Sequence, residues 1–263
     1  MTKTLAVILN HNLPEYTDLL YNSLVSFQRN DYQLIVMDNG SRPDLVSKNT
    51  SIRFQANLFW GGAFNEAFKM VLNNPEYDSL LFLNNDIEVT GEIFVRSLRD
   101  ELFKGNYAMI SPCIAGRAQP WKQMQNWGNP STRIVKWIDM QAPLINRKLI
   151  EKINQFDPAL YYGWGQELIC MDICESMGWK TGVCDFICIL HVGKQTVFQN
   201  RLFNVKTEEF EIDYNSPITW QEYLDSAWES YVNYFAEHPL KNGEFYEMRA
   251  YGEQYSCVTS SKK

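Results

Sequence analysis

Three short groups of polar residues in this chain each follow directly on an apolar run of strand length. Asn84, Asn85 and Asp86 come after the run at 80–83. The same arrangement puts Asn10, His11 and Asn12 after residues 5–9, and Asp38, Asn39, Gly40 and Ser41 after residues 34–37. Carboxylate oxygens bind hard divalent cations, and amides accept hydrogen bonds from hydroxyl groups. These residue types predict a polar binding site in which Asp86 is the best candidate metal ligand.

The elements that must position these groups alternate between strand and helix. Strands are expected at 4–9, 33–38, 52–54, 79–84 and 107–110, and helices at 14–27, 61–72 and 90–103, the last with Thr90 as its N-cap. Continuous apolar strands separated by helices predict a mostly parallel α/β sheet buried on both faces. Such sheets bind ligands beyond the carboxyl ends of their strands. We therefore expect the three polar groups to share one site.

The pattern changes after Pro112. Residues 112–133 are rich in polar residues and contain Trp121 and Trp127, which predicts a long loop or hairpin. The two tryptophans either make it a lid or only fix the loop. Further strands are expected at 134–138, 143–145, 179–184 and 187–192, and helices at 166–177, ending at Gly178, and at 219–237. We predict one domain over 1–200 and a C-terminal helical extension over 201–263, packed on the core or at a homodimer interface.

Composition narrows the function classes. The chain has 263 residues and a net charge of −7, so it lacks the basic footprint of a nucleic-acid-binding protein. No apolar run approaches the roughly 20 residues that span a bilayer, and the opening strand argues against a signal peptide. The six cysteines are expected to stay as thiols. We predict a cytoplasmic protein, which leaves open a membrane-bound acceptor.

Four of the cysteines form two Cys-x₃-Cys pairs, Cys170 with Cys174 and Cys184 with Cys188, and His191 follows them. Zinc binding is one reading of this pattern. The first pair falls on one face of a helix and the second on one face of a strand, which are ordinary positions for buried thiols. We favour the core reading.

With its elements placed, the chain resembles the inverting GT-A glycosyltransferases of family 2, and within them the rhamnosyltransferase-like branch whose metal motif is Asn-Asn-Asp. Four blocks carry the resemblance: the three polar groups above and residues 57–65. A looser fifth block runs from Phe156 to His191. The resemblance covers about residues 4–196. It implies a Rossmann-like GT-A fold that transfers a sugar from a UDP- or dTDP-sugar to a saccharide or other hydroxyl acceptor, with Mn²⁺ or Mg²⁺ as cofactor.

The resemblance also implies roles for particular residues. Asp86 matches the second acid of the family's Asp-x-Asp motif, and His191 matches a further metal or diphosphate contact. Both have simpler readings, Asp86 as a turn or cap residue and His191 as a locally bonded histidine. Asp38 matches the acid that contacts the pyrimidine. Contacts to the nucleotide sugar are expected from Asn10, Asn12, Asp38, Asn57, Gly61, Gly62, Asn65, Asn84 and Asn85.

Glu167 is the expected general base that deprotonates the acceptor. The family usually has Glu-Asp at this point, whereas this chain has Gln166 and Glu167. The alternative is a first-turn glutamate that only interacts with the helix dipole, and Asp172 is a fallback base. Acceptor contacts are expected from Tyr162, Trp164 and Gln166. For the aromatic residues, core packing is the competing interpretation.

Two other functions remain open. The first alternative is a nucleotide-sugar-binding module without catalysis, in which Asn84 and Gln166 mark lost activity. A sugar nucleotidyltransferase is the second alternative. It requires a basic, glycine-rich loop after the first strand, and residues 10–14 do not provide one.

Overall fold

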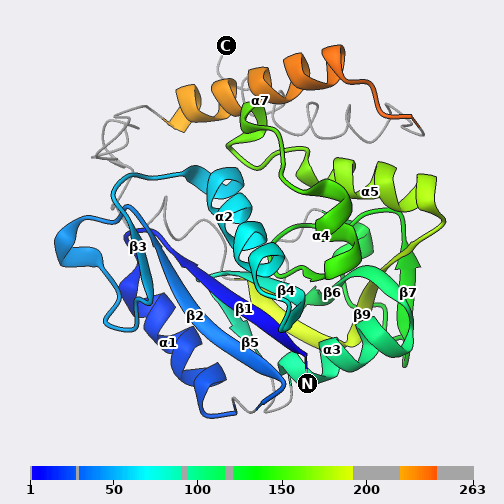
Figure 1. The fold of residues 1–263 in the computed structure, drawn as a ribbon, viewed down its shortest axis with the longest axis horizontal. Coiled ribbons are helices and arrows are strands. Elements are labelled where there is room, and N and C mark those ends of the chain that lie inside the picture. The colour runs from blue at the N-terminus through cyan, green and yellow to red at the C-terminus, as the bar shows by residue number, and fades with distance from the viewer. Residues whose placement is uncertain (1, 28–29, 90–93, 116–120, 192–219, 242–263) are drawn as a thin grey trace.

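A computed structural model describes residues 2–27, 30–89, 94–115, 121–191 and 220–241 (Figure 1). Their strands form one nine-stranded sheet in the order β3-β2-β1-β4-β8-β6-β9-β5, with β7 paired to β9. The first four strands are parallel: β1 (Lys3–Asn10), β2 (Tyr32–Asn39), β3 (Ile52–Phe54) and β4 (Tyr77–Asn84). The remaining strands are β5 (Ile87–Val89), β6 (Tyr107–Ala115), β7 (Thr132–Val135), β8 (Leu144–Asn146) and β9 (Lys180–His191). The predicted mostly parallel α/β fold is confirmed.

Helices cover both faces of the sheet. They are α1 (Pro14–Val25), α2 (Phe59–Asn73), α3 (Phe94–Lys104), α4 (Arg147–Ile153), α5 (Gln166–Met177) and α7 (Trp220–Glu237), with a short 3₁₀ helix η3 (Pro158–Leu160) before α5. Thr17 of α1 bonds Asn10 of β1, whereas Phe64 of α2 packs on Phe82 of β4. Asn10 and Phe82 point to opposite faces because alternate residues of paired strands do so. Helices α1 and α2 therefore sandwich the parallel half of the sheet.

The hydrophobic pattern explains why these elements form. Residues 4–10 of β1 are all buried, as a central parallel strand requires. Helix α2 buries Phe64, Phe68 and Val71, which recur at helical spacing and face the sheet. Together these side chains form one main core. The carboxyl ends of β1, β2 and β4 then lie at one edge, where the polar groups begin.

Several expected boundaries are wrong. Strand β9 is one strand and not two, because residues 185–187 form a bulge between Cys184, which pairs with Pro112, and Cys188, which pairs with Cys113. Helix α2 begins at Phe59, so the glycine pair lies inside its first turn. Strands were expected at 134–138 and 143–145, and β7 and β8 occupy 132–135 and 144–146. Strand β5 and helix α4 were not expected at all.

Part of the sequence prediction falls outside the described residues. This applies to Thr90, to 116–120 of the long loop, and to most of the predicted extension, at 201–219 and 242–263. In the part that is described, no helix combines the length and the apolar character needed to cross a membrane.

The expectation that all six cysteines are thiols is wrong. Cys113 and Cys188 form a disulfide between the paired strands β6 and β9, with their Cα atoms 4.8 Å apart. Cys170, Cys174 and Cys184 are free and buried. Burial raises the pKa of the Cys184 thiol to about 12. Because Cys188 is bonded to sulfur, it is not available as a thiolate ligand for zinc.

Candidate functional site

A row of three polar side chains crosses the ends of the first three strands. Asn10, Asp38 and Arg53 are neighbours in the registers of β1, β2 and β3. The Asn10 amide donates to Asp38 Oδ1 over 2.7 Å, and Arg53 Nε lies 3.4 Å from Asp38 Oδ2. The Asp38 side chain is fully buried, whereas that of Arg53 is 47% exposed. The guanidinium of Arg53 is thus the group that this row presents at the surface.

Hydrogen bonds continue from this row to the Asn-Asn-Asp group. Thr17 donates its hydroxyl to Asn10 Oδ1 over 2.8 Å, and Asn85 Nδ2 donates to the Thr17 hydroxyl over 3.0 Å. Asn84 is the register partner of Leu9, next to Asn10 in β1. The residues at the ends of β1, β2 and β4 therefore lie at one edge of the sheet.

Asp86 and His191 come together at the same edge. Asp86 lies in the turn between β4 and β5, and Ile87 of β5 is the register partner of His191 at the end of β9. His191 Nε2 is 3.2 Å from Asp86 Oδ1. Burial lowers the pKa of His191, but the hydrogen bond and the negative charge of Asp86, with a contribution from Asp139, outweigh it, so the pKa is raised overall.

This pair fits a divalent cation bound with a diphosphate. One carboxylate oxygen and one imidazole nitrogen are a donor set that suits Mn²⁺. Among the described residues, no group of three or more His, Cys, Asp or Glu side chains is arranged to hold a metal. A hard cation bound with a nucleotide commonly takes only one or two protein ligands, and phosphate oxygens and water complete its shell. Asp86 and His191 match that number of protein ligands.

Two more predicted residues help to order the loops beside the row. Asn12 donates its backbone N–H to the Ser41 hydroxyl and accepts from the backbone N–H of Arg42. Asn57 Oδ1 accepts from Asn39 Nδ2 over 2.9 Å. His11 Nδ1 lies 2.8 Å from the Asn39 carbonyl oxygen. Hydrogen bonds therefore join residues 11–12, 39–42 and 57 into one polar network around the strand ends.

The structure gives packing roles to Gly61, Gly62 and Asn65. The Gly61 N–H donates to the Tyr161 carbonyl over 2.7 Å, and the Gly62 N–H donates to the Leu58 carbonyl over 3.2 Å. Asn65 bonds both the N–H and the carbonyl of Phe156. The N–H groups of these three residues therefore already donate to carbonyl oxygens within the protein. Their predicted contacts to the nucleotide sugar stay predictions.

Glu167 lies in the first turn of α5, next to the residues that were predicted to contact the acceptor. It is 4% exposed, and Gln166 is fully buried with its amide donating to the Leu160 carbonyl over 3.3 Å. Tyr162 is 7% exposed, and Trp164 is partly buried. Tyr161, a further aromatic residue that could face the sugar, is 38% exposed and is the most exposed of this group. We refer to α5, η3 and the segment between them as the acceptor side, because they hold the residues predicted to contact the acceptor.

Phe59 connects the acceptor side to the strand ends. Its ring lies 5.1 Å from that of Tyr161 and 5.0 Å from that of Tyr162. Its carbonyl accepts from Asn39 Nδ2 over 3.1 Å, and its φ of 53° is in the left-handed region. Holding a non-glycine residue in this conformation costs free energy, so the contacts on both sides must fix it.

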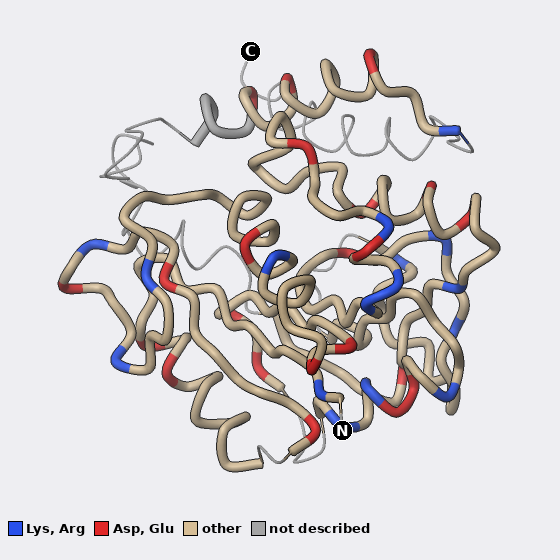
Figure 2. The backbone as a smooth tube through the Cα atoms, in the orientation of Figure 1, with Lys and Arg blue, Asp and Glu red and all other residues tan. Residues whose placement is uncertain are grey.

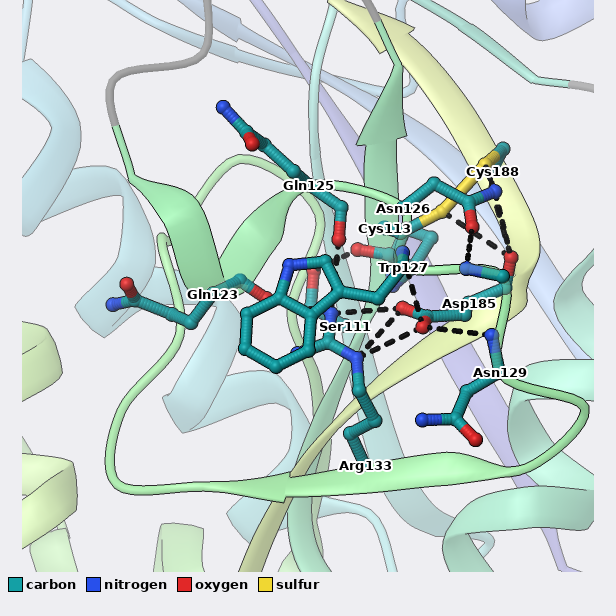
Figure 3. Close-up of a disulfide and its surroundings, with 12 residues drawn as sticks. Ser111, Cys113, Gln123, Gln125, Asn126, Trp127, Asn129, Arg133, Asp185 and Cys188 are labelled. Atoms are coloured by element: carbon teal, nitrogen blue, oxygen red, sulfur yellow. Dashed lines mark hydrogen bonds and ion pairs between the residues drawn. A yellow bond between two sulfur atoms is a disulfide. The ribbon is translucent and has the colours of Figure 1, made fainter.

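The described part of the long loop is tied to the sheet (Figure 3). Arg133 of β7 and Asp185 in the β9 bulge form a buried ion pair at 2.8 Å. Asp185 also accepts the backbone N–H of Trp127, whose ring lies 4.1 Å from the Arg133 guanidinium. Trp121 instead packs edge-on against Trp137. These contacts favour the reading in which the tryptophans fix the loop.

Charge is distributed along the whole chain and is not gathered in one tract. Figure 2 shows basic and acidic positions interspersed along the described backbone. At the strand ends, the Arg53 guanidinium supplies local positive charge. Arg53 was not predicted from the sequence, although a basic residue in a short strand after the Asp38 group was visible.

Neither a protein-family model nor a curated protein matches this sequence. Solved structures do match. GalNAc-T7 with UDP, GalNAc and Mn²⁺ gives a TM-score of 0.60 at 13% identity, over 97% of this chain and 55% of that one. The mannosyltransferase PcManGT from Pyrobaculum calidifontis, with GDP-Man and Mn²⁺, gives 0.55 at 12% identity, over 73% and 58%.

Staphylococcus aureus TarS 1–349, in complex with UDP-GlcNAc, gives a TM-score of 0.52 at 13% identity, over 72% of this chain and 58% of that one. This chain therefore spans a little more than half the length of these proteins. At such identities the likeness concerns the fold. The chain has the GT-A fold of nucleotide-sugar glycosyltransferases.

Proposed function

We propose that this chain is a metal-dependent, inverting GT-A glycosyltransferase that uses a UDP- or dTDP-sugar and a saccharide or other hydroxyl acceptor. The observation that carries the proposal is the Asp86–His191 pair at 3.2 Å, at the sheet edge that also holds the Asn10–Asp38–Arg53 row. A GT-A sheet with a candidate cation-binding pair and a polar row at the same edge supports sugar transfer from a nucleotide donor.

Each part has a task in the reaction. The acceptor oxygen attacks the anomeric carbon opposite the diphosphate, the bond from that carbon to the diphosphate oxygen breaks, and Glu167 takes the acceptor's proton. A single displacement of this kind inverts the configuration. A divalent cation held by Asp86 and His191 would neutralise the charge that develops on the leaving diphosphate. Asp38 and Arg53 would hold the nucleotide.

The row favours a pyrimidine nucleotide. A pyrimidine such as uracil or thymine has a ring N–H that a carboxylate accepts and carbonyl oxygens to which a guanidinium donates. The Arg53 guanidinium is exposed for this contact, whereas the Asp38 carboxylate beside it is fully buried and would have to be uncovered to accept the ring N–H. The assignment to family 2 and to the rhamnosyltransferase-like branch stays a prediction that rests on the Asn84, Asn85 and Asp86 motif.

The test is calorimetric titration of UDP and dTDP into the protein with and without Mn²⁺. We expect Mn²⁺ to strengthen nucleotide binding at least tenfold in the wild type, and Asp86→Ala to remove that gain. Asp100→Asn, an exposed carboxylate on α3, is the matched control and should behave like the wild type. Equal Mn²⁺ dependence in the wild type and Asp86→Ala would refute the metal assignment.

Catalysis is tested by nucleotide release from UDP-glucose, UDP-GlcNAc and dTDP-rhamnose with water as acceptor. Glu167→Gln should retain nucleotide binding and lose release by about 10²-fold or more, because it removes the base. Release at the wild-type rate would show that Glu167 is not the base.

The second candidate function, a nucleotide-sugar-binding module without catalysis, is favoured by one observation. Glu167 is only 4% exposed, so an acceptor has little access to it in this arrangement. In this case nucleotide and Mn²⁺ bind to the wild type, but none of the three donors releases its nucleotide. A homodimer through the C-terminal helix and a cytoplasmic location stay predictions.

A further inference from the structure

The disulfide between Cys113 and Cys188 lies at a discontinuity of the sheet (Figure 3). Before the bulge in β9, Cys184 pairs with Pro112 of β6. After the bulge, Cys188 pairs with Cys113, so the disulfide joins the first residue pair of the resumed ladder. From this pair β9 continues only as far as His191.

The part of the sheet beyond the bulge is small. It consists of residues 188–191 of β9, residues 113–115 of β6 and the three-residue strand β5. In the described part of the chain, β5 has no neighbour in the sheet other than β9. Because strands this short are marginal on their own, this corner of the sheet depends on whatever holds β9 in it. The disulfide is the covalent bond that does so.

The same corner positions the candidate cation-binding pair. Ile189 is paired with β6 on one side and with β5 on the other. At the end of the strand, His191 pairs with Ile87, and its Nε2 lies 3.2 Å from Asp86 Oδ1. Because successive side chains point to opposite faces, a slip of one residue in this register would turn His191 away from Asp86. The contact therefore depends on the register that the disulfide fixes.

One sulfur of the bond lies near the surface. Cys113 is fully buried, whereas Cys188 is only partly buried. Asn126, an exposed residue of the long loop, donates its amide to Cys188 Sγ over 3.2 Å and to the Asp185 carbonyl over 3.1 Å. Thiol–disulfide exchange requires access to a sulfur atom, so an incoming thiolate attacks at Cys188.

We propose that the Cys113–Cys188 disulfide is a redox switch of the cation site. The oxidised form holds His191 on Asp86, and reduction releases the end of β9 and weakens cation binding. The inference rests on the proposed function, because it regulates the cation site that is assigned there.

A dithiol is the reductant that this step requires. One thiolate of the dithiol attacks Cys188 Sγ, the S–S bond breaks, and Cys113 leaves as a thiolate that takes up a proton. The second thiol of the dithiol then attacks the mixed disulfide and displaces Cys188. The dithiol is oxidised by two electrons to a cyclic disulfide, and its two protons end on the two cysteines.

Reduction should affect the two parts of the site differently. The Asn10–Asp38–Arg53 row lies on β1, β2 and β3, which pair with one another and with β4 but not with β9. Nucleotide binding without a cation should therefore survive reduction. The additional affinity that Mn²⁺ supplies should fall, because it depends on His191.

The test titrates UDP, with and without Mn²⁺, into the oxidised protein and into protein reduced with dithiothreitol and desalted under anaerobic buffer. Reduction should diminish the Mn²⁺-dependent gain in UDP affinity about fivefold or more, and leave the Kd for UDP alone within about twofold. Cys113→Ala/Cys188→Ala should behave as the reduced protein in both states. Cys174→Ala, which removes a buried free thiol, should switch as the wild type does.

A measurement without any ligand separates this inference from the proposed function. The chain has three histidines, so ¹H–¹³C spectra of histidine-labelled protein follow each ring, and His191→Gln assigns the His191 signals. Reduction should shift the His191 signals and leave those of His11 and His238 in place. If the oxidised wild type gains nothing from Mn²⁺ while the His191 signals shift, the proposed cation site fails and the link from the disulfide to His191 stands.

Three results would overturn the switch. One is an equal Mn²⁺-dependent gain in the oxidised and reduced wild type. Another is a set of His191 ring signals that do not change on reduction. The third is a loss of UDP binding both with and without Mn²⁺, which would mean that the disulfide supports the fold as a whole.

Discussion

The Asp38 side chain is fully buried next to Arg53, so its first task in the structure is to hold other protein groups. As a residue in sequence it is an acid after a strand, and an acid there is expected to face the ligand. In the structure its oxygens accept from Asn10 and from the Ser41 N–H, and one lies 3.4 Å from Arg53 Nε. Asp38 therefore orients the guanidinium that is exposed at the surface, and its own contact to a nucleotide stays a prediction.

Gly61 shows a second role that sequence alone does not reveal. A Cβ at this position would lie 2.5 Å from both the Leu160 carbonyl oxygen and Gln166 Nε2. The glycine allows α2 to pack directly on the acceptor side, where its N–H bonds Tyr161. The residue needs its small size whether or not a diphosphate binds nearby.

We predict that Gly61→Ala destabilises the protein by about 1–3 kcal/mol, because the new methyl group must displace a backbone carbonyl. Urea unfolding measures the change. Gly62→Ala is the control, since its Cβ would meet only the Leu58 side chain within 4 Å, so its loss should be smaller. A larger loss for Gly62→Ala would contradict the packing argument.

At the residue scale, the sequence pointed to Asp86 and His191 because a strand end and a motif mark them. The structure places the two side chains 3.2 Å apart, and their metal role stays a prediction. Arg53 was missed because its contact is with a residue of another element, Asp38 in β2. No local pattern records such partners.

At the scale of elements, the three-residue strand β5 has a disproportionate role. It pairs antiparallel with the end of β9 and places Ile87 opposite His191. This pairing sets the Asp86–His191 contact. Three residues are too few to show a strand period, so β5 could not be predicted from the sequence.

Helix α4 was missed for a different reason: its N-cap Asn146, which accepts the Lys148 N–H, was visible but overlooked.

The ion pair between Arg133 and Asp185 ties β7, the β9 bulge and the loop into one unit. Burial raises the pKa of Asp185, but its hydrogen bonds with Arg133, with support from backbone N–H groups, outweigh this and lower the pKa below its usual value. A carboxyl with a lowered folded-state pKa stabilises the protein above its unfolded pKa. That stability is lost as the pH falls through the folded pKa.

We therefore predict that Asp185→Asn costs about 3 kcal/mol or more at pH 7, because it leaves Arg133 buried without its counter-charge. The difference from the wild type should shrink below about pH 3.9, as the wild-type carboxyl itself becomes neutral. Chemical unfolding at several pH values measures this. Asp100→Asn, at an exposed site, should stay close to the wild type throughout, and a gap for Asp185→Asn that does not change with pH would argue against the ion pair.

At the scale of the whole molecule, the sequence was sufficient for the architecture. Alternating apolar strands and amphipathic helices specify the parallel half, β1 to β4, and its helices. The mixed half, from β5 to β9, was predicted less well, because its strands pair across long sequence separations. The Cys113–Cys188 bond belongs here: the β6–β9 register makes these two residues neighbours, and their spacing in sequence does not.

We predict that a reductant lowers the urea midpoint of the wild type, because the disulfide closes a long loop, with a sequence separation of 75, and such bonds contribute about 2–4 kcal/mol. The double variant Cys113→Ala/Cys188→Ala should start from the lower midpoint and not respond to reductant. Cys170→Ala, which removes a free thiol, should respond as the wild type does. An unchanged wild-type midpoint would show that the bond does not stabilise the fold.

The pairing of β5 with β9 also has a consequence for biosynthesis. Asp86 emerges from the ribosome long before His191, and the strand that aligns them is too short to stay paired alone. The parallel half has all its strands by residue 84 and can condense during translation. The Asp86–His191 pair is therefore assembled late, and a nascent chain that stalls before β9 is finished should acquire an ordered amino-terminal layer without the proposed cation site.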